Sequence, residues 1–184
     1  MERIYIYDGY FEQGEKGNPL IRKAAALFCE EAGIEFKEDA EIIRPENGKP
    51  YFKDLPVKFS LSHSGIMWMC VMSTVSCGLD VQITKPCKYQ KLTERFFNPD
   101  DYRYVELWGE SGFYDLWVRK EAFAKCTGKG IFSQTPAFTD ENHNLAEKIT
   151  VKGRTYYFKD IHIAEDIRCA VCSIEEIHDE MRLI

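Results

Sequence analysis

Apolar positions along the chain change their spacing several times, and each spacing predicts a type of element. Near the start, "RIYIY" alternates as a strand does. A helix is expected next, between Pro19 at its first turn and Gly33 at its end. Its apolar stripe consists of Leu20, Ala24, Leu27 and Phe28. The segments "PYF", "VKFSLSHSG" and "IMWMCVMSTVSCGLDVQ" then predict strands, so the first half is expected to run from helix to strands.

The second half repeats this order of elements. Helical spacing is found around residues 89–97, 100–108 and 113–127, and Gly128 is expected to end the last helix. Strands with turn signals between them follow from residue 148 to residue 174. The chain shows no sequence repeat, yet the doubled order predicts an α+β fold made of a pseudo-twofold pair of similar α/β subdomains, residues 1–77 and 78–184. We expect the active site in the cleft between them.

Composition narrows the class of protein. The chain has 184 residues and a net charge of −6, which argues against a nucleic-acid partner. It has no run of 18 apolar residues and no signal-peptide pattern at its charged start, so we expect a cytoplasmic protein without a membrane partner. Its seven cysteines are scattered, which predicts structural thiols and not a disulfide framework or a zinc site.

Basic residues gather in two places in this acidic chain. Residues 48–91 carry six lysines against only two acids, and "RKEAFAKCTGK" carries four basic side chains against one acid. Two such islands suit a compact polyanion better than a long one. Ordinary solvated lysines are the alternative.

The predicted helix over residues 113–127 brings two charged residues to the border of its buried stripe. Glu121 and Lys125 are four residues apart and share one flank beside Trp117. A Glu and Lys pair at this spacing is also an ordinary helix-stabilising pair, so the helix alone does not decide between structure and chemistry.

Asp80 is the second charged residue in an unexpected place. It stands in "GLDVQ", at the end of an apolar strand, where a carboxylate is costly unless it is paired or bound to a cation. Gln82 projects to the same side of the strand, so the two residues can offer oxygen atoms to one hard cation such as Mg²⁺. A strand-end aspartate is also a common turn former.

The stretch "FSLSHSG" supplies small hydroxyls, an imidazole and a glycine, which are the groups that approach phosphate closely. Ser62, His63 and Ser64 do not form a hydrolase triad, because neighbours on an extended chain cannot face one another. The chain contains neither a Walker A loop nor a dinucleotide glycine fingerprint.

Taken together, "NGKPYF", "FSLSHSG", "GLDVQ" and "LWVRKEAFAKCTGKGI" resemble, in order and spacing, the motifs of the surfactin-type 4′-phosphopantetheinyl transferases. The last motif is the most specific, with Trp117, Lys120, Glu121, Ala122 and Lys125 in the family's places. The resemblance covers roughly residues 45 to 132.

The resemblance implies an enzyme that transfers 4′-phosphopantetheine from coenzyme A to a serine of an apo acyl or peptidyl carrier protein and releases adenosine 3′,5′-bisphosphate. It implies that Asp80 and Glu121 hold Mg²⁺, or Mn²⁺, on the pyrophosphate and that Lys125 offsets the charge of the breaking bond. Glu121 is either a metal ligand or the base for the incoming serine. The remaining residues, expected to contact coenzyme A, are Lys49, Pro50, Ser62, His63 and Lys120.

The chain departs from the family pattern at Gln82, where many bacterial members have a second acid. Gln82 is a third candidate metal ligand, through its amide oxygen or through a water molecule. The alternative function is that of a non-catalytic relative that binds coenzyme A or carrier proteins. Arg22 and Lys23 are candidates for the 3′-phosphate contact, and we expect a monomer; the sequence leaves the carrier and its pathway open.

Overall fold

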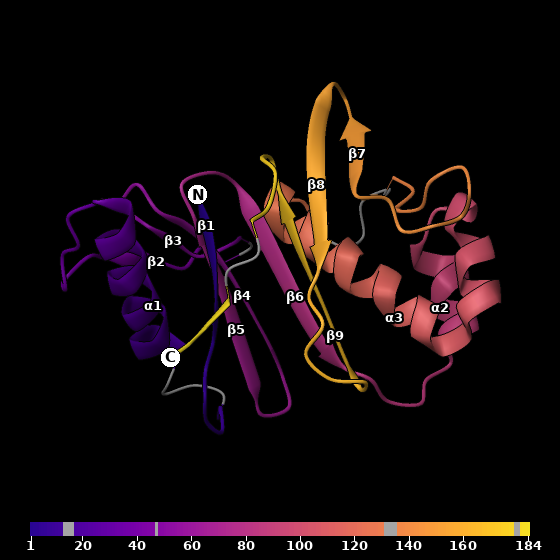
Figure 1. Ribbon diagram of the computed structural model, residues 1–184, viewed down its shortest axis with the longest axis horizontal. Helices are drawn as coiled ribbons and strands as arrows, with labels where there is room; N and C mark the ends of the chain where they lie inside the picture. Colours follow the sequence, from indigo (N-terminus) through magenta and orange to yellow (C-terminus); the bar gives the residue numbers. More distant parts are fainter. Residues whose placement is uncertain (13–16, 47, 131–135, 179–180) are drawn as a thin grey trace.

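The computed structural model describes residues 1–12, 17–46, 48–130, 136–178 and 181–184. In these ranges the chain forms two four-stranded sheets, one two-stranded sheet and three α-helices (Figure 1). The mixed composition of helices and sheets that the sequence predicts is therefore confirmed. None of the described helices is both long and apolar enough to cross a membrane.

The first sheet is built mainly from the N-terminal half. Its strand order is β10-β1-β5-β4, with neighbours antiparallel except for the parallel pair of β1 and β10. The helix α1 (Gly17–Ala32) lies beside it, and β2 (Ile42–Ile43) and β3 (Tyr51–Phe52) form the small sheet. The strands of the first sheet are β1 (Glu2–Ile6), β4 (Lys58–Ser64), β5 (Met67–Ser73) and β10 (Met181–Leu183).

The second sheet has the order β6-β9-β8-β7, with every neighbouring pair antiparallel. The helices α2 (Tyr89–Phe96) and α3 (Tyr102–Thr127) belong to this half, and a short 3-10 turn, η1 (Pro99–Asp101), precedes α3. The strands are β6 (Cys77–Ile83), β7 (Lys148–Val151), β8 (Arg154–Asp160) and β9 (Ile167–Ser173).

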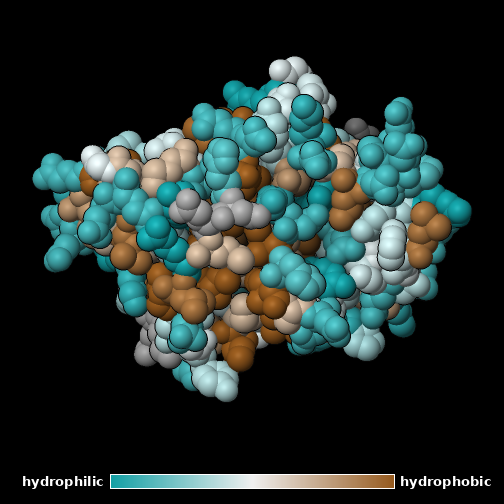
Figure 2. Space-filling model, viewed as in Figure 1, coloured by the Kyte–Doolittle hydropathy of each residue, from teal (hydrophilic) through white to brown (hydrophobic). Residues whose placement is uncertain are grey.

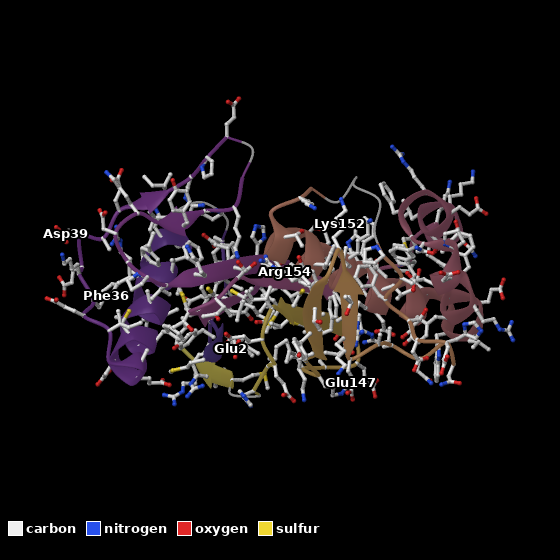
Figure 3. All side chains as sticks on the ribbon, turned by 90° about the horizontal axis from the view of Figure 1, so that it is seen from above. Glu2, Phe36, Asp39, Glu147, Lys152 and Arg154 are labelled. Atoms are coloured by element: carbon white, nitrogen blue, oxygen red, sulfur yellow. The ribbon has the colours of Figure 1, made fainter. Side chains whose placement is uncertain are left out.

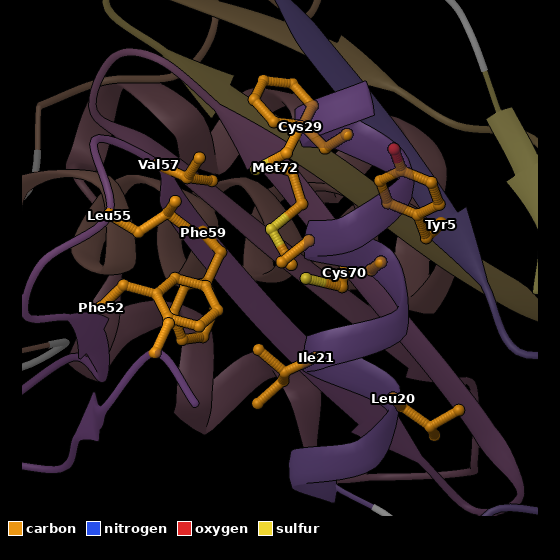
Figure 4. Close-up of a cluster of buried hydrophobic side chains, with 14 of the residues drawn as sticks. Tyr5, Leu20, Ile21, Cys29, Phe52, Leu55, Val57, Phe59, Cys70 and Met72 are labelled. Atoms are coloured by element: carbon orange, nitrogen blue, oxygen red, sulfur yellow. The ribbon is translucent and has the colours of Figure 1, made fainter. Parts of the chain in front are cut away.

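Three groups of buried apolar side chains hold these layers together. The first lies between α1 and the first sheet, where the predicted helical stripe packs on strand residues such as Phe59 and Met72 (Figure 4). The second lies between α3 and the second sheet. The third joins the two sheets, because Leu79 and Val81 of β6 pack with Met69 and Val71 of β5. In Figure 2, hydrophobic side chains accordingly gather low in the middle of the molecule, between more hydrophilic ends.

The helix α3 joins two segments that the sequence predicts as separate helices. Within α3 the chain is non-helical only at Gly109, with φ 60° and ψ −136°, between the predicted segments 100–108 and 113–127. A glycine tolerates this conformation because it has no Cβ. Gly128 ends α3 in the left-handed conformation, with φ 70°, as predicted.

The strand β10 was not predicted. It is only three residues long and its residues are exposed, so it carries no hydrophobic alternation that the sequence could reveal. It pairs with β1 and so brings the C-terminal end of the chain into the first sheet. The division at residues 77 and 78 remains a prediction, and β6 begins at Cys77.

The two sheets meet where β4 runs alongside β6, and serine side chains make this junction. Ser60 accepts a hydrogen bond from the amide of Leu79 at 3.1 Å, and Ser64 accepts one from the amide of Ile83 at 2.9 Å. Between them Ser62 donates its hydroxyl to Asp80 at 2.7 Å. The alternating serines of "FSLSHSG" therefore provide hydrogen-bond partners for the backbone amides of β6 and for the Asp80 carboxylate. The sequence did not reveal this role.

Gly78 sets how closely α3 approaches β6. A Cβ at this position would overlap with the carbonyl oxygen of Ala122 and lie 2.6 Å from the amide nitrogen of Cys126. Both contacts are with backbone atoms, which cannot rotate away as a side chain can. Only glycine therefore allows α3 to lie this close to β6.

We expect the substitution Gly78→Ala to destabilise the protein by at least about 3 kcal/mol, because the added methyl group must push α3 away from β6. Urea unfolding followed by circular dichroism measures this. Gly17→Ala is the matched control, since nothing lies within 4 Å of a Cβ there, and it should change stability by no more than about 1 kcal/mol. Equal stability of the two variants would contradict the close packing.

Candidate active site

Asp80 is the most completely surrounded polar group of the junction. It is 2% exposed, and its Oδ1 accepts hydrogen bonds from the Ser62 hydroxyl and from the Lys125 ammonium, each at 2.7 Å. Its Oδ2 accepts one from the Gln82 side-chain amide at 3.0 Å. The buried carboxylate is thus charge-compensated by a lysine and oriented by two neutral donors.

Lys125 reaches Asp80 from the other side of the junction. Its ammonium also donates to the carbonyl oxygen of Leu79 at 2.9 Å. Because α3 and β6 touch at Gly78, a lysine one turn after Glu121 can span the short gap to the strand. The ion pair is partly exposed on the lysine side, with 28% of the Lys125 side chain accessible.

Glu121 lies on the same edge of α3 and is half-buried. The pKa of its carboxyl group is raised, first by burial and second by the negative charge of Asp80, while Lys125 and Lys120 act in the opposite direction. The two acids come from β6 and α3, and they lie close enough to repel one another. The structure therefore brings together four of the predicted site residues: Asp80, Gln82, Glu121 and Lys125.

A cavity of about 400 Å³ opens beside this group. It lies between the segment before β3, which contributes Lys49 and Pro50, and the C-terminal end of α3, which contributes Glu121 and Lys125. Arg44 and Lys129 also line it. Four cationic side chains against one carboxylate make this cavity suited to an anion with several charges.

Lys49 occupies the cavity wall in an unexpected way. Its ammonium donates to the carbonyl oxygen of Cys77 at 2.5 Å, at the start of β6. This contact fixes the segment around Lys49 and Pro50 to the second sheet, and it leaves the lysine charge at the cavity wall. Asn47 of the motif "NGKPYF" and Ile131, the final residue of the motif "LWVRKEAFAKCTGKGI", lie outside the described residues.

Three predicted contact residues do not line the cavity. Ser62 points at Asp80, as described above. His63 follows on the opposite face of β4, where it is exposed and its ring centroid lies 5.3 Å from that of Phe11. Lys120 is 1% exposed, burial lowers its pKa to about 8, and the charge of Asp101 opposes this shift. Helical geometry explains its position, because the residue next to Glu121 must point away from Glu121's edge of the helix.

Arg44 and Lys129 are cavity residues for which the sequence predicted no contact. Lys129 belongs to the basic stretch "RKEAFAKCTGK", and this gathering of positive charge was the available signal. Arg44 gave no signal, because only folding brings its segment against α3. Arg22, a candidate for phosphate contact, instead donates to the backbone of Glu38 at 2.6 Å.

The donor set of this site fits a hard cation. No group of three or more His, Cys, Asp or Glu side chains that could hold a metal exists in the described ranges. Two carboxylates from opposite elements, Asp80 and Glu121, are however what Mg²⁺ commonly uses when a substrate phosphate completes its coordination. Their mutual repulsion, seen in the raised pKa of Glu121, is what a cation between them would relieve.

The second half of the chain carries a recognisable family pattern. Residues 76–172 match the profile of the 4′-phosphopantetheinyl transferase superfamily. The chain belongs to this superfamily. The matched range runs from the start of β6 into β9, so it includes Asp80, Gln82, Glu121 and Lys125 but not the segment of Lys49 or the strand β4.

Curated relatives extend the match to the first half. A 4′-phosphopantetheinyl transferase of Bacillus subtilis is 30% identical over 168 residues, which cover 85% of this chain and 71% of the relative. The transferase Sfp of Bacillus subtilis strain 168 is 29% identical over 145 residues, covering 74% of this chain and 64% of Sfp. The transferase psf-1 of Bacillus pumilus is 38% identical over 98 residues, covering 50% of this chain and 42% of psf-1. The matched part of this chain thus spans between about two fifths and seven tenths of these superfamily members.

The electrostatic coupling between the two acids gives a direct test. In Asp80→Asn the pKa of Glu121 should fall, because one repelling charge is removed and Lys125 loses its competing partner. It should stay above its ordinary value, since burial remains. Carbon-detected NMR titration of the side-chain carboxyl groups measures this. The control Glu106→Gln, an exposed position on α3, should leave it unchanged, and an unchanged value in Asp80→Asn would refute the coupling.

Proposed function

We propose that this protein transfers the 4′-phosphopantetheine group of coenzyme A to a serine hydroxyl of an apo acyl or peptidyl carrier protein, with release of adenosine 3′,5′-bisphosphate. The observation that carries the proposal is the group of Asp80, Glu121 and Lys125, of which Glu121 and Lys125 line a cavity that also holds three further cationic side chains. Its supporting evidence is membership of the superfamily and the names of the curated relatives.

The cations of the cavity fit the charge of coenzyme A. Its pyrophosphate and its 3′-phosphate are three phosphate groups in one compact molecule, and the cavity offers Arg44, Lys49, Lys125 and Lys129. Gly48 and Pro50 line the same cavity and carry no long side chain, which leaves room for the nucleotide beside them. His63 lies on the opposite face of β4 from Ser62 and is exposed, so in this proposal its contact with a coenzyme A phosphate would be made outside the cavity.

Lys125 is placed to offset the negative charge that grows as the bond between the two phosphates breaks. Phosphoryl transfer needs mainly alignment and charge cancellation, and a lysine anchored by Asp80 and Leu79 supplies both at a fixed position. Burial and the charge of Asp80 raise the pKa of Glu121, which makes its carboxylate a stronger base, so it also suits the role of activating the serine hydroxyl.

Asp80 and Glu121 would hold Mg²⁺, or Mn²⁺, in this proposal. The bound ion supplies Lewis-acid stabilisation of charge on the phosphate oxygens. Gln82 donates its amide group to Asp80, which leaves its carbonyl oxygen as the third candidate donor for the ion or for its water. A glutamine in this place lowers the negative charge of the site without removing the oxygen.

The proposed pseudo-twofold relation finds support in the topology. The strands β1, β5 and β4 are adjacent in that order in one sheet, and β6, β9 and β8 are adjacent in that order in the other. In each set the first strand is followed in the chain by a long helix, α1 or α3. We propose residues 1–77 and 78–184 as the two subdomains. A monomeric state, a cytoplasmic location and the lack of nucleic-acid and membrane partners belong to the same proposal.

The transfer reaction itself is the first test. The protein is incubated with coenzyme A, Mg²⁺ and a panel of apo acyl and peptidyl carriers, and each carrier is weighed by mass spectrometry. We expect at least one carrier to gain a phosphopantetheine group, and a chelator to abolish the gain. A panel that stays entirely in the apo form would count against the proposal.

Isosteric substitutions then test the assigned residues. Asp80→Asn and Glu121→Gln should each lower the rate of transfer by at least about 100-fold, because each removes a charge at the reacting phosphates. The matched control is Glu106→Gln on the exposed side of α3, whose carboxylate pairs with Arg103 at the surface. Wild-type rates in both site variants would refute the assignment.

A non-catalytic binder of coenzyme A or carrier proteins remains the second candidate, on the single observation that Gln82 replaces an acid. It predicts nucleotide binding without turnover in either Mg²⁺ or Mn²⁺. It further predicts that Gln82→Glu creates turnover. Turnover by the unaltered protein excludes it.

A further inference from the structure

The mechanism above makes no use of the cysteines, although three of them meet where α3 rests on the second sheet. Cys126 is the residue after Lys125, Cys172 lies in β9 directly opposite Gly78, and Cys77 begins β6. All seven cysteines of the chain are free thiols. The group therefore lies beside the candidate active site without belonging to it.

Cys126 and Cys172 touch one another through their side chains. The Cys126 thiol accepts a hydrogen bond from the Cys172 thiol and donates one to the carbonyl oxygen of Ser76 at 3.5 Å. Two thiols in hydrogen-bond contact are close enough for a disulfide to form with a small movement.

The two thiols differ in character. The hydrogen bond from Cys172 is the largest cause of a lowered pKa at Cys126, and the charges of Lys49 and Arg154 act in the same direction. Burial raises the pKa of Cys172 well above its ordinary value. Figure 3 labels Arg154, the first residue of β8, near the middle of the molecule. Because Cys126 also lines a cavity and Cys172 does not, Cys126 is the thiol of the pair that is oxidised first.

A small oxidant can reach this pair. Cys126 lines a cavity of about 300 Å³ together with Lys49 and Lys125, on the side of α3 that faces the candidate active site. Cys172 lies behind it and is fully buried. A thiolate-prone cysteine at a cavity wall with a second thiol behind it is the arrangement found in redox-sensitive proteins.

We propose that Cys126 is an oxidation site, and that its disulfide with Cys172 switches the active site off. The Cys126 thiolate attacks one oxygen of hydrogen peroxide, the O–O bond breaks, and Cys126 becomes a sulfenic acid as hydroxide leaves and takes up a proton as water. The sulfur of Cys172 then attacks the Cys126 sulfur, the S–O bond breaks and a second water leaves. Two thiols and one peroxide thus give one disulfide and two waters.

The disulfide disturbs the site because the last turn of α3 is tightly packed on β6 and cannot take up the change without shifting. A disulfide holds its sulfur atoms about 2.0 Å apart, which is far inside a non-bonded contact. The backbone of Cys126 is already packed on Gly78, so drawing Cys126 toward β9 must turn or shift the last turn of α3. Lys125 precedes Cys126, and its contacts with Asp80 and Leu79 depend on that turn.

Peptide mapping after treatment with hydrogen peroxide tests the oxidation site without any transfer assay. We expect one disulfide that links the peptides of Cys126 and Cys172, and its loss on treatment with dithiothreitol. Cys172→Ser, which keeps a hydrogen-bond donor, should form no such link, while Cys87→Ser should form it as the wild type does. A link to Cys77, or no link at peroxide concentrations that oxidise Cys87, would overturn the proposal.

The switch rests on the proposed function and is tested separately. Oxidised wild type should lose on the order of 100-fold in transfer rate, as expected when a catalytic group moves by about 1 Å, and should regain it with dithiothreitol. Reduced Cys172→Ser should transfer at the wild-type rate and show no activity that dithiothreitol can restore after oxidation. A mapped disulfide with unchanged transfer would overturn the switch alone, whereas no transfer by reduced wild type would overturn the proposed function.

Discussion

The contact between α3 and β6 at Gly78 is the constraint on which the rest of this molecule depends. The backbones of the helix and the strand touch there, at Ala122 and Cys126, and these are the residues directly after Glu121 and Lys125. Asp80 lies two residues further along the same face of β6. A side chain at residue 78 would separate the acids and the lysine. Because Gly78 has no Cβ, α3 can lie close enough to β6 for Glu121, Lys125 and Asp80 to interact.

The site contains a negative charge, that of Glu121, whose burial and repulsion by Asp80 lower the stability of the folded state. Asp80 is buried but compensated by Lys125, whereas Glu121 has a raised pKa, so its ionisation destabilises the folded state. The contribution of Glu121 to stability is therefore greatest at a pH where it is protonated in both the folded and the unfolded state, and it falls as the pH rises from the ordinary pKa of a glutamate through the raised pKa of the folded state. Such a cost is expected of a group that is kept for chemistry and not for packing. A cation and a phosphate would relieve it.

Much of this picture was predictable from the sequence, and the exceptions have physical reasons. Spacing of apolar residues predicted α1 and both parts of α3, because their buried stripes are long. The pairing of Asp80 with Gln82 followed from the alternation of a strand. The sequence did not reveal β10, which is too short to alternate, or the serine contacts of β4, which depend on a neighbour 19 residues away in the case of Leu79. The motif did not reveal that Lys120 is buried and does not line the cavity, because a motif names residues and not the side of the helix that each one faces.

The central claim is that acids from β6 and α3 share one divalent ion beside the pyrophosphate of coenzyme A. A crystal structure of the protein with coenzyme A and Mn²⁺, with the metal located by its anomalous scattering, tests this claim most directly. We predict a single manganese ion bound by both Asp80 and Glu121, with the pyrophosphate beside Lys125 and the nucleotide along Lys49 and Pro50. A metal bound by only one of the two acids, or a nucleotide outside the cavity between Arg44 and Lys129, would contradict it.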